Sequence, residues 1–196
     1  MQSAALSRLK LARYDTSKER LVFSAPMMVL FAAGGAVLTG ALAQIRLPLP
    51  FTPVPVTGQV LAILLCGSLL GSGYGLLSQA LFIAAGLAGV PWLAGGKTGM
   101  EALLMPSTGY LVGFMAMAFY VGHGTRAGAW GRTLQGQTAV MLAGVAINLF
   151  LGATYLTLTM GLTPWQGLCM GVLPFVAVDV VKAVMAAMLT SAVLPK

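Results

Sequence analysis

The stretch VLPFVAVDVVKAVMAAMLTSAVL (residues 172–194) decides the fold class of this chain, because it is long, apolar and almost free of charge. About 20 consecutive apolar residues are enough for an α-helix to cross a bilayer. Within this stretch only Asp179 and Lys182 are charged. A charge at the centre of a membrane helix costs about 2.5–3.5 kcal/mol on insertion scales, so we expect neither side chain to face lipid.

Asp179 and Lys182 are spaced three residues apart, which puts them on one face of a helix with Cβ atoms about 5–6 Å apart. We expect the pair to point inward, in the outer half of its helix. Ionisable residues inside the membrane usually belong to a functional site, and this pair therefore predicts ligand binding. The alternative is an ion pair that only fastens this helix to a neighbour.

The composition of the whole chain indicates a membrane protein. Of its residues 58% are hydrophobic and 8% are charged, and the mean hydropathy is +0.91. Soluble domains carry about 25% charged residues, so that class is excluded. The net charge of +7 is concentrated partly in residues 1–25, which we interpret as a basic cytoplasmic segment on the anionic membrane surface and not as a nucleic-acid site. Residues 26–196 then form one membrane domain that binds a substrate.

Apolar runs separated by Pro- and Gly-rich connections predict an all-α integral membrane protein with six transmembrane helices, at 26–45, 58–70, 73–89, 107–122, 137–160 and 166–193. Cytoplasmic loops carry an excess of Lys and Arg. Arg126, Arg132, Lys196 and the five basic residues before helix 26–45 fall on one side, against Arg46 and Lys97 on the other. This predicts cytoplasmic N- and C-termini and a multi-pass protein of the bacterial cytoplasmic membrane. A signal peptide cleaved after residues 41–43 is the alternative for the first helix.

Two outer connections have unusual sequences. Residues 46–57 are rich in proline, which favours a stiff, extended backbone, and residues 89–109 carry glycines and polar groups among apolar ones. Backbone that is not helical is tolerated at membrane depth only where it packs in protein or lines a cavity. We therefore expect both connections to cover a pocket.

Several further polar and aromatic residues are candidates for ligand binding. Amides within apolar helices bind a polar ligand or form interhelical hydrogen bonds, and aromatic residues form flat walls or interfacial anchors. A phosphate loop is excluded around Lys97, because Pro91 stands where that motif needs glycine. With Asp179 and Lys182, the candidates are Lys97, Trp92, Gln79, Gln59, Tyr110 and Asn148.

Small residues recur every fourth position on the first helix, at Ala32, Ala36 and Gly40. Such a stripe lets another helix approach closely, so it predicts either a docking site for a membrane partner or internal packing. Catalysis has little support, because His123 is the only histidine and no motif of a membrane enzyme is present. We expect neither an enzyme nor a bound cofactor or metal.

Four short motifs resemble the BioY family, the biotin-specific S components of energy-coupling factor (ECF) transporters. They are PVPVTGQ (53–59), GLAGVPWLAGG (86–96), PSTGYLVGF (106–114) and PFVAVDVVK (174–182), in the order of that family. The resemblance implies a six-helix fold, with biotin held near the outer face beneath the connecting loops. It also implies a transmembrane coupling subunit and ABC-type ATPases as partners.

The resemblance also implies roles for individual residues. Asp179 and Lys182 match the pair that contacts the ureido ring region. Gln79 falls on the polar position of the third helix, and Trp92 and Lys97 fall on the aromatic and basic positions of the following loop. Ala32 and Ala36 match the small residues that meet the coupling subunit. An S component for another small vitamin and a membrane assembly subunit without ligand remain the alternatives.

Overall fold

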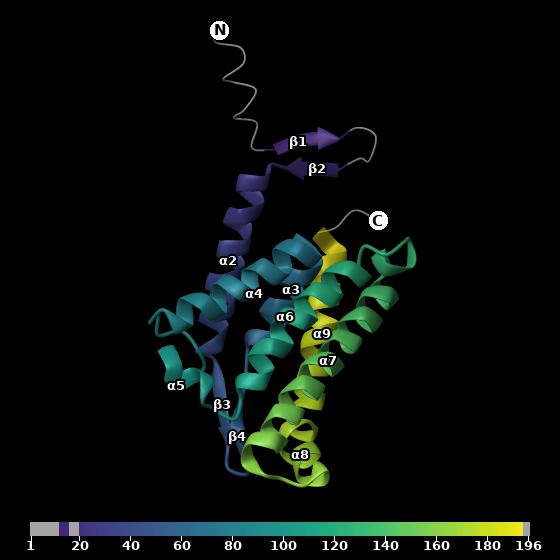
Figure 1. The fold of residues 1–196 in the computed structure, drawn as a ribbon. Coiled ribbons are helices and arrows are strands. Elements are labelled where there is room, and N and C mark those ends of the chain that lie inside the picture. Colours follow the sequence, from purple (N-terminus) through teal and green to yellow (C-terminus); the bar gives the residue numbers. More distant parts are fainter. Residues whose placement is uncertain (1–11, 16–19, 194–196) are drawn as a thin grey trace.

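The computed structural model describes residues 12–15 and 20–193, which are mostly helical (Figure 1). The helices are α2 (Ala25–Ala43), α3 (Gln59–Leu70), α4 (Ser72–Leu87), α5 (Gly99–Leu103), α6 (Thr108–Gly124), the 3₁₀ helix η1 (Trp130–Arg132), α7 (Leu134–Met160), α8 (Pro164–Gly171) and α9 (Leu173–Val193). The strands are β1 (Ala12–Asp15), β2 (Arg20–Phe23), β3 (Arg46–Leu49) and β4 (Thr52–Thr57). Two antiparallel pairs, β1–β2 and β3–β4, correct the all-α prediction.

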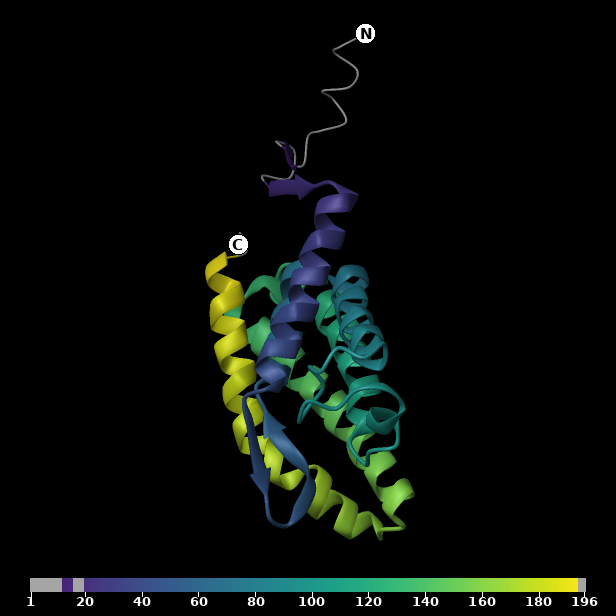
Figure 2. The same cartoon turned by 90° about the vertical axis from the view of Figure 1, so that its left-hand side faces the viewer.

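The bundle has two distinct ends. Helix α2 begins and α9 finishes at one end, whereas the β3–β4 hairpin, α5 and α8 gather at the opposite end (Figures 1 and 2). We call this second part the hairpin end. The two connections expected to lie together, 46–57 and 89–109, both belong to it. Proline keeps the first connection extended, and the structure pairs its two halves into the hairpin, with Arg46 opposite Thr57.

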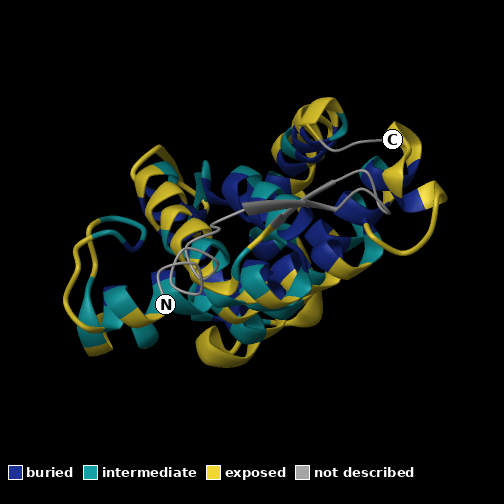
Figure 3. Cartoon of the chain, turned by 90° about the horizontal axis from the view of Figure 1, so that it is seen from above, coloured by how far each residue is buried: buried dark blue, intermediate teal, exposed yellow. Residues whose placement is uncertain are grey.

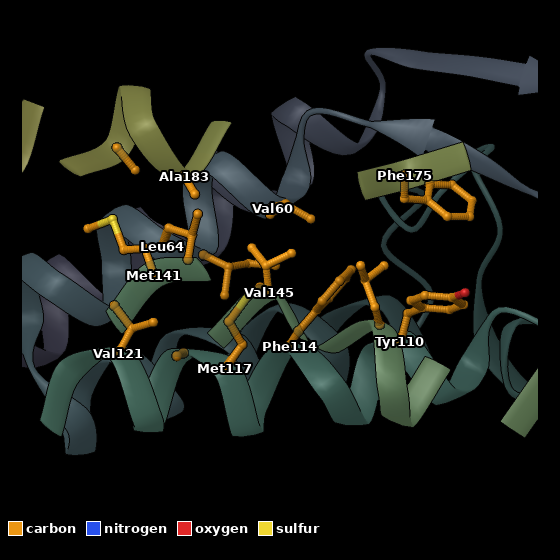
Figure 4. Packing of buried hydrophobic residues seen from close by; sticks show 14 of the residues in the cluster. Val60, Leu64, Tyr110, Phe114, Met117, Val121, Met141, Val145, Phe175 and Ala183 are labelled. Atoms are coloured by element: carbon orange, nitrogen blue, oxygen red, sulfur yellow. The ribbon is translucent and has the colours of Figure 1, made fainter. Parts of the chain in front are cut away.

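The core is built around α6 and α7, which pack along each other in the middle of the bundle. Buried side chains from all the larger helices and from the hairpin end form one cluster, and Figure 4 shows the part of it that runs from Val121 to Tyr110 and Phe175. Seen from above, buried residues face the centre of the bundle and exposed ones face outward (Figure 3). Many outward residues are large and apolar, such as Phe150, Leu158 and Val181, as expected for a surface in contact with lipid.

Three helices of the described residues are long and apolar enough to span a membrane, namely α2, α7 and α9. Helices α3 and α4 are apolar but shorter, with 12 and 16 residues. A helix rises about 1.5 Å per residue, so these two alone fall short of the roughly 30 Å hydrocarbon core. The chain is therefore a mostly helical membrane protein with helices of unequal length.

The predicted helix 166–193 is wrong in one respect, because the structure divides it into α8 and α9 at Val172. Pro174 lacks the N–H that would donate to the Met170 carbonyl oxygen in a continuous helix. Val172 has non-helical angles, φ −124° and ψ −61°, and α9 begins at the next residue, Leu173. The break lets α8 turn across the hairpin end, whereas α9 runs the length of the bundle (Figure 2).

Glycine permits the closest approach of helices at the other end of the bundle. Gly71, between α3 and α4, has φ +87°, a left-handed backbone that favours glycine. Gly122 of α6 packs directly on this turn, since a Cβ added there would lie 2.7 Å from the carbonyl oxygen of Gly67 and closer still to the backbone of Gly71 and Ser72. The turn and α6 therefore leave no room for a side chain between them.

Candidate ligand-binding site

A cavity lies at the hairpin end, between β4, the α4–α5 connection and the ends of four helices. About 700 Å³ there is free of protein atoms, a volume that includes space open to solvent. Its lining is mainly apolar with a few polar groups. The lining residues are Val54, Pro55, Thr57, Gln59, Val60, Leu93, Ala94, Lys97, Ala102, Met105, Ser107, Tyr110, Leu111, Phe114, Asn148, Leu149, Phe175, Asp179 and Lys182.

The charged pair of α9 forms one wall of this cavity. Asp179 is 3% exposed, and its Oδ1 accepts a hydrogen bond from Lys182 Nζ at 2.7 Å. The same Nζ donates to the carbonyl oxygen of Thr57, also at 2.7 Å. The pair therefore faces inward, as expected, and lies in the half of α9 nearer the hairpin end. Charge-assisted hydrogen bonds are about twice as strong as neutral ones, so this contact joins α9 firmly to β4.

The position of α9 is fixed by two aromatic residues. The Tyr110 hydroxyl donates to the Gly171 carbonyl oxygen at 2.5 Å, just before the break between α8 and α9. The ring centroids of Tyr110 and Phe175 are 6.1 Å apart, and both side chains line the cavity (Figure 4). Phe175, Asp179 and Lys182 follow the helical spacing of four and three residues, so one face of α9 supplies an apolar group, an acceptor and a cation.

Two buried amides on the cavity wall have unsatisfied atoms. Gln59 is 3% exposed, and its Oε1 accepts from Thr57 Oγ1 at 3.0 Å, but its Nε2 has no partner among the described residues. Asn148 is 1% exposed, and its Oδ1 likewise has none. An unsatisfied buried polar atom costs about 1–3 kcal/mol, so a ligand that pairs with these amides gains that free energy.

Lys97 reaches the cavity from the α4–α5 connection. Its Nζ lies 3.9 Å from Glu101 Oε2, and the two side chains are 47% and 80% exposed. Exposed pairs of this kind contribute about 0–1 kcal/mol, because water screens them. Lys97 is therefore available to an anionic group at the mouth of the cavity.

Two of the candidate residues lie outside the cavity. Gln79 is fully buried on α4, where its Nε2 donates to Ser78 Oγ at 3.3 Å and to Thr39 Oγ1 at 3.4 Å. Trp92 donates from Nε1 to the Phe82 carbonyl oxygen at 3.0 Å. Gln79 thus joins α4 to α2, and Trp92 fastens the α4–α5 connection to α4.

The stripe of small residues on α2 packs internally. Ala32 is 0% and Ala36 2% exposed, and Gly40 lies against the ring of Trp92. Of the two interpretations of the stripe, internal packing describes the structure. The exposed side of α2 carries larger apolar residues, including Leu30 and Val37.

Sequence reasoning missed several residues that line the cavity. Phe175 had a recognisable signal, because it lies four residues before Asp179 on the same helix face. Thr57, Met105, Ser107 and Phe114 had no such signal, because their place depends on how the hairpin and α6 fold over the cavity.

The fold and the cavity together define a class: mostly helical membrane proteins with a small-molecule pocket at one end of the bundle. A family model described as the BioY family matches residues 15–196. The chain belongs to the BioY family, which confirms the resemblance drawn from the four motifs.

Named relatives and a solved structure agree with this assignment. Biotin transporter BioY of Rhizobium etli is 32% identical over 173 residues, covering 85% of this chain and 92% of the relative. Probable biotin transporter BioY of Methanothermobacter thermautotrophicus is 37% identical over 137 residues, 66% of this chain and 87% of the relative. The crystal structure of the S-component for biotin from an ECF-type ABC transporter matches with a TM-score of 0.77 and 25% identity, covering 87% of this chain and 94% of that one.

Proposed function

We propose that this chain captures biotin and takes part in its uptake as the substrate-binding subunit of an ECF-type transporter. The observation that carries the proposal is the buried Asp179–Lys182 pair on the wall of a cavity, in a member of the BioY family. The relatives described above are biotin transporters, and the matching structure is an S-component for biotin. The role is transport, with no chemical conversion of the ligand.

The chemistry of the cavity suits the parts of biotin. The ureido ring has two N–H donors and one carbonyl acceptor, so Asp179 accepts an N–H and Gln59 Nε2 donates to the carbonyl. Asn148 offers a further amide beside them. Phe175 and Tyr110 cover the apolar thiophane ring, and Lys97 at the mouth meets the carboxylate of the tail. Where the ligand displaces water from the buried part of the cavity, these contacts gain strength.

The arrangement of the helices supports a proposal for the membrane topology. We place six helices, α2, α3, α4, α6, α7 and α9, across the bilayer of the bacterial cytoplasmic membrane, with both termini in the cytoplasm. The short helices fit this arrangement because the hairpin and α5 extend the protein at the outer end. We assign residues 1–25, most of which lie outside the described residues, to a basic cytoplasmic segment, and residues 26–196 to the substrate-binding domain. Arg126 and Arg132 then lie on the cytoplasmic side.

Titration of the purified protein with biotin tests the proposed function. We expect saturable binding at a Kd below micromolar, because buried polar groups on a mainly apolar wall bind a complementary small molecule tightly. Other small vitamins, such as thiamine and riboflavin, serve as matched ligands and are expected not to bind. Tight binding of one of these instead of biotin would assign an S component for that vitamin, and binding of none would favour a membrane assembly subunit.

Uptake of labelled biotin tests the proposed partners, a transmembrane coupling subunit and ABC-type ATPases. We expect uptake in a biotin-requiring host that expresses these subunits and none in a host that lacks them, because the chain has no ATP-binding motif. The small residues of α2 can meet the coupling subunit only if α2 moves away from α4, because Ala32 and Ala36 are buried. Full uptake without the other subunits would contradict this proposal.

A further inference from the structure

The hairpin end carries an excess of positive charge. Its charged residues in the described chain are three cations and two carboxylates, namely Arg46, Lys97, Lys182, Glu101 and Asp179. Lys182 is paired with Asp179 at 2.7 Å, and Lys97 approaches Glu101 at 3.9 Å. Arg46 has no ion-pair partner among the residues that the structure describes. One unpaired cation in a region that borders lipid favours an anionic ligand with a single charge.

Arg46 lies between two segments that line the cavity. On β3 it is paired in register with Thr57, whose carbonyl oxygen holds Lys182. Its guanidinium packs on Gly95, where Nη1 lies 2.6 Å from the position that a Cβ would occupy. Gly95 has φ +84° and stands between Ala94 and Lys97 of the lining. The Arg46 side chain is exposed and is not itself part of the lining, but glycine at position 95 lets its guanidinium lie beside the segment that supplies Ala94 and Lys97.

We infer that Arg46 is a specificity-determining residue, which forms a carboxylate subsite with Lys97 at the cavity mouth. The inference deepens the proposed function and depends on it: the subsite takes the anionic tail of the ligand, whereas Asp179 holds the ring. Two properties support this division. The planar guanidinium matches a carboxylate with two parallel hydrogen bonds, and Lys97, two residues from Gly95, contributes a second, more mobile charge.

Two other roles for Arg46 make different predictions. A guanidinium that only anchors the hairpin at lipid headgroups leaves the affinity of the cavity unchanged for every ligand. A guanidinium that clamps the hairpin to the α4–α5 connection affects every ligand of the cavity equally. Only a carboxylate subsite distinguishes a ligand with a charged tail from the same ligand with a neutral tail.

The test compares biotin with biotinamide, which has the same rings and a neutral tail, on protein in zwitterionic nanodiscs. For Arg46→Gln we expect about a tenfold loss of affinity for biotin and less than about a twofold change for biotinamide. Arg46→Lys keeps the charge, and we expect its affinity for biotin to fall by about threefold or less. Arg132→Gln removes an exposed cation at the opposite end of the bundle and is the matched control, with no expected change for either ligand.

Equal losses for the two ligands in Arg46→Gln would overturn the inference in favour of a clamp, and unchanged affinity for both would overturn it in favour of a lipid anchor. If Arg46→Gln does not fold, the two ligands are compared on Lys97→Gln, and their affinities for the unaltered protein are measured at several salt concentrations. If salt lowers the affinity for biotin and for biotinamide equally, the inference is overturned. Failure of the unaltered protein to bind either ligand counts against the proposed function itself.

Discussion

Asp179→Asn is expected to lower the affinity for biotin by about 10- to 150-fold while the protein remains folded. The substitution keeps the size of the side chain but removes the charge that accepts the hydrogen bond from Lys182 at 2.7 Å and faces the cavity. Hydrogen bonds to charged groups contribute about 1.5–3 kcal/mol, and each 1.4 kcal/mol corresponds to tenfold in affinity. The measurement is a biotin titration by calorimetry, accompanied by thermal unfolding.

Glu101→Gln is the matched control for this variant. It also removes a carboxylate at the hairpin end, but the side chain of Glu101 is 80% exposed and lies 3.9 Å from its cation. We expect its affinity for biotin to change by less than about threefold. If Asp179→Asn lowers the melting temperature but leaves the affinity unchanged, the pair is a structural fastening and not part of the ligand site.

Gly122→Ala is expected to destabilise the whole bundle. The added methyl would lie 2.7 Å from the Gly67 carbonyl oxygen and closer to the backbone of the α3–α4 turn, which cannot move aside as a side chain does. Overpacking usually costs about 1–3 kcal/mol, and contact with backbone places this variant at the upper limit. For a chain of this size a loss of about 3 kcal/mol lowers the melting temperature by roughly 6–12 °C.

Gly73→Ala separates this effect from helix propensity. Gly73 also lies in a helix, but no atom is within 4 Å of the Cβ that alanine would add. Alanine favours a helix over glycine by about 1 kcal/mol, so we expect an equal or slightly higher melting temperature. An equally stable Gly122→Ala protein would show that α6 and the turn are not in direct contact.

The charged pair was the part of the site that the sequence could predict best. A charge that faces lipid costs so much free energy that both side chains are expected to face inward. The faces of the other helices were harder to assign. Gln79 shares the buried face of α4 with Gly75 and Phe82, so its periodicity predicts burial but does not tell which neighbour it meets. It packs against α2 and not against the cavity.

Connections were the least predictable part of the fold. The prolines of residues 46–57 predict an extended backbone, but pairing into a hairpin depends on contacts distant in sequence, such as the one between Thr57 and Lys182. Pro174 did carry a signal for the break between α8 and α9, and the long apolar run concealed it. Trp92 was expected to form a wall of the pocket because aromatic residues often do, whereas its indole N–H fastens the connection to α4.

On the proposed function, the bond from Lys182 to Thr57 couples the ligand affinity to the position of the hairpin. Lys182 Nζ bonds both to the Asp179 carboxylate on its own helix and to the Thr57 carbonyl oxygen on β4, so a hairpin that moves away from α9 leaves Lys182 with one partner fewer. A coupling free energy acts equally in both directions. If the ligand pairs with Asp179 as proposed, its binding stabilises the hairpin against α9, and a partner that moves the hairpin away lowers the ligand affinity by the same free energy.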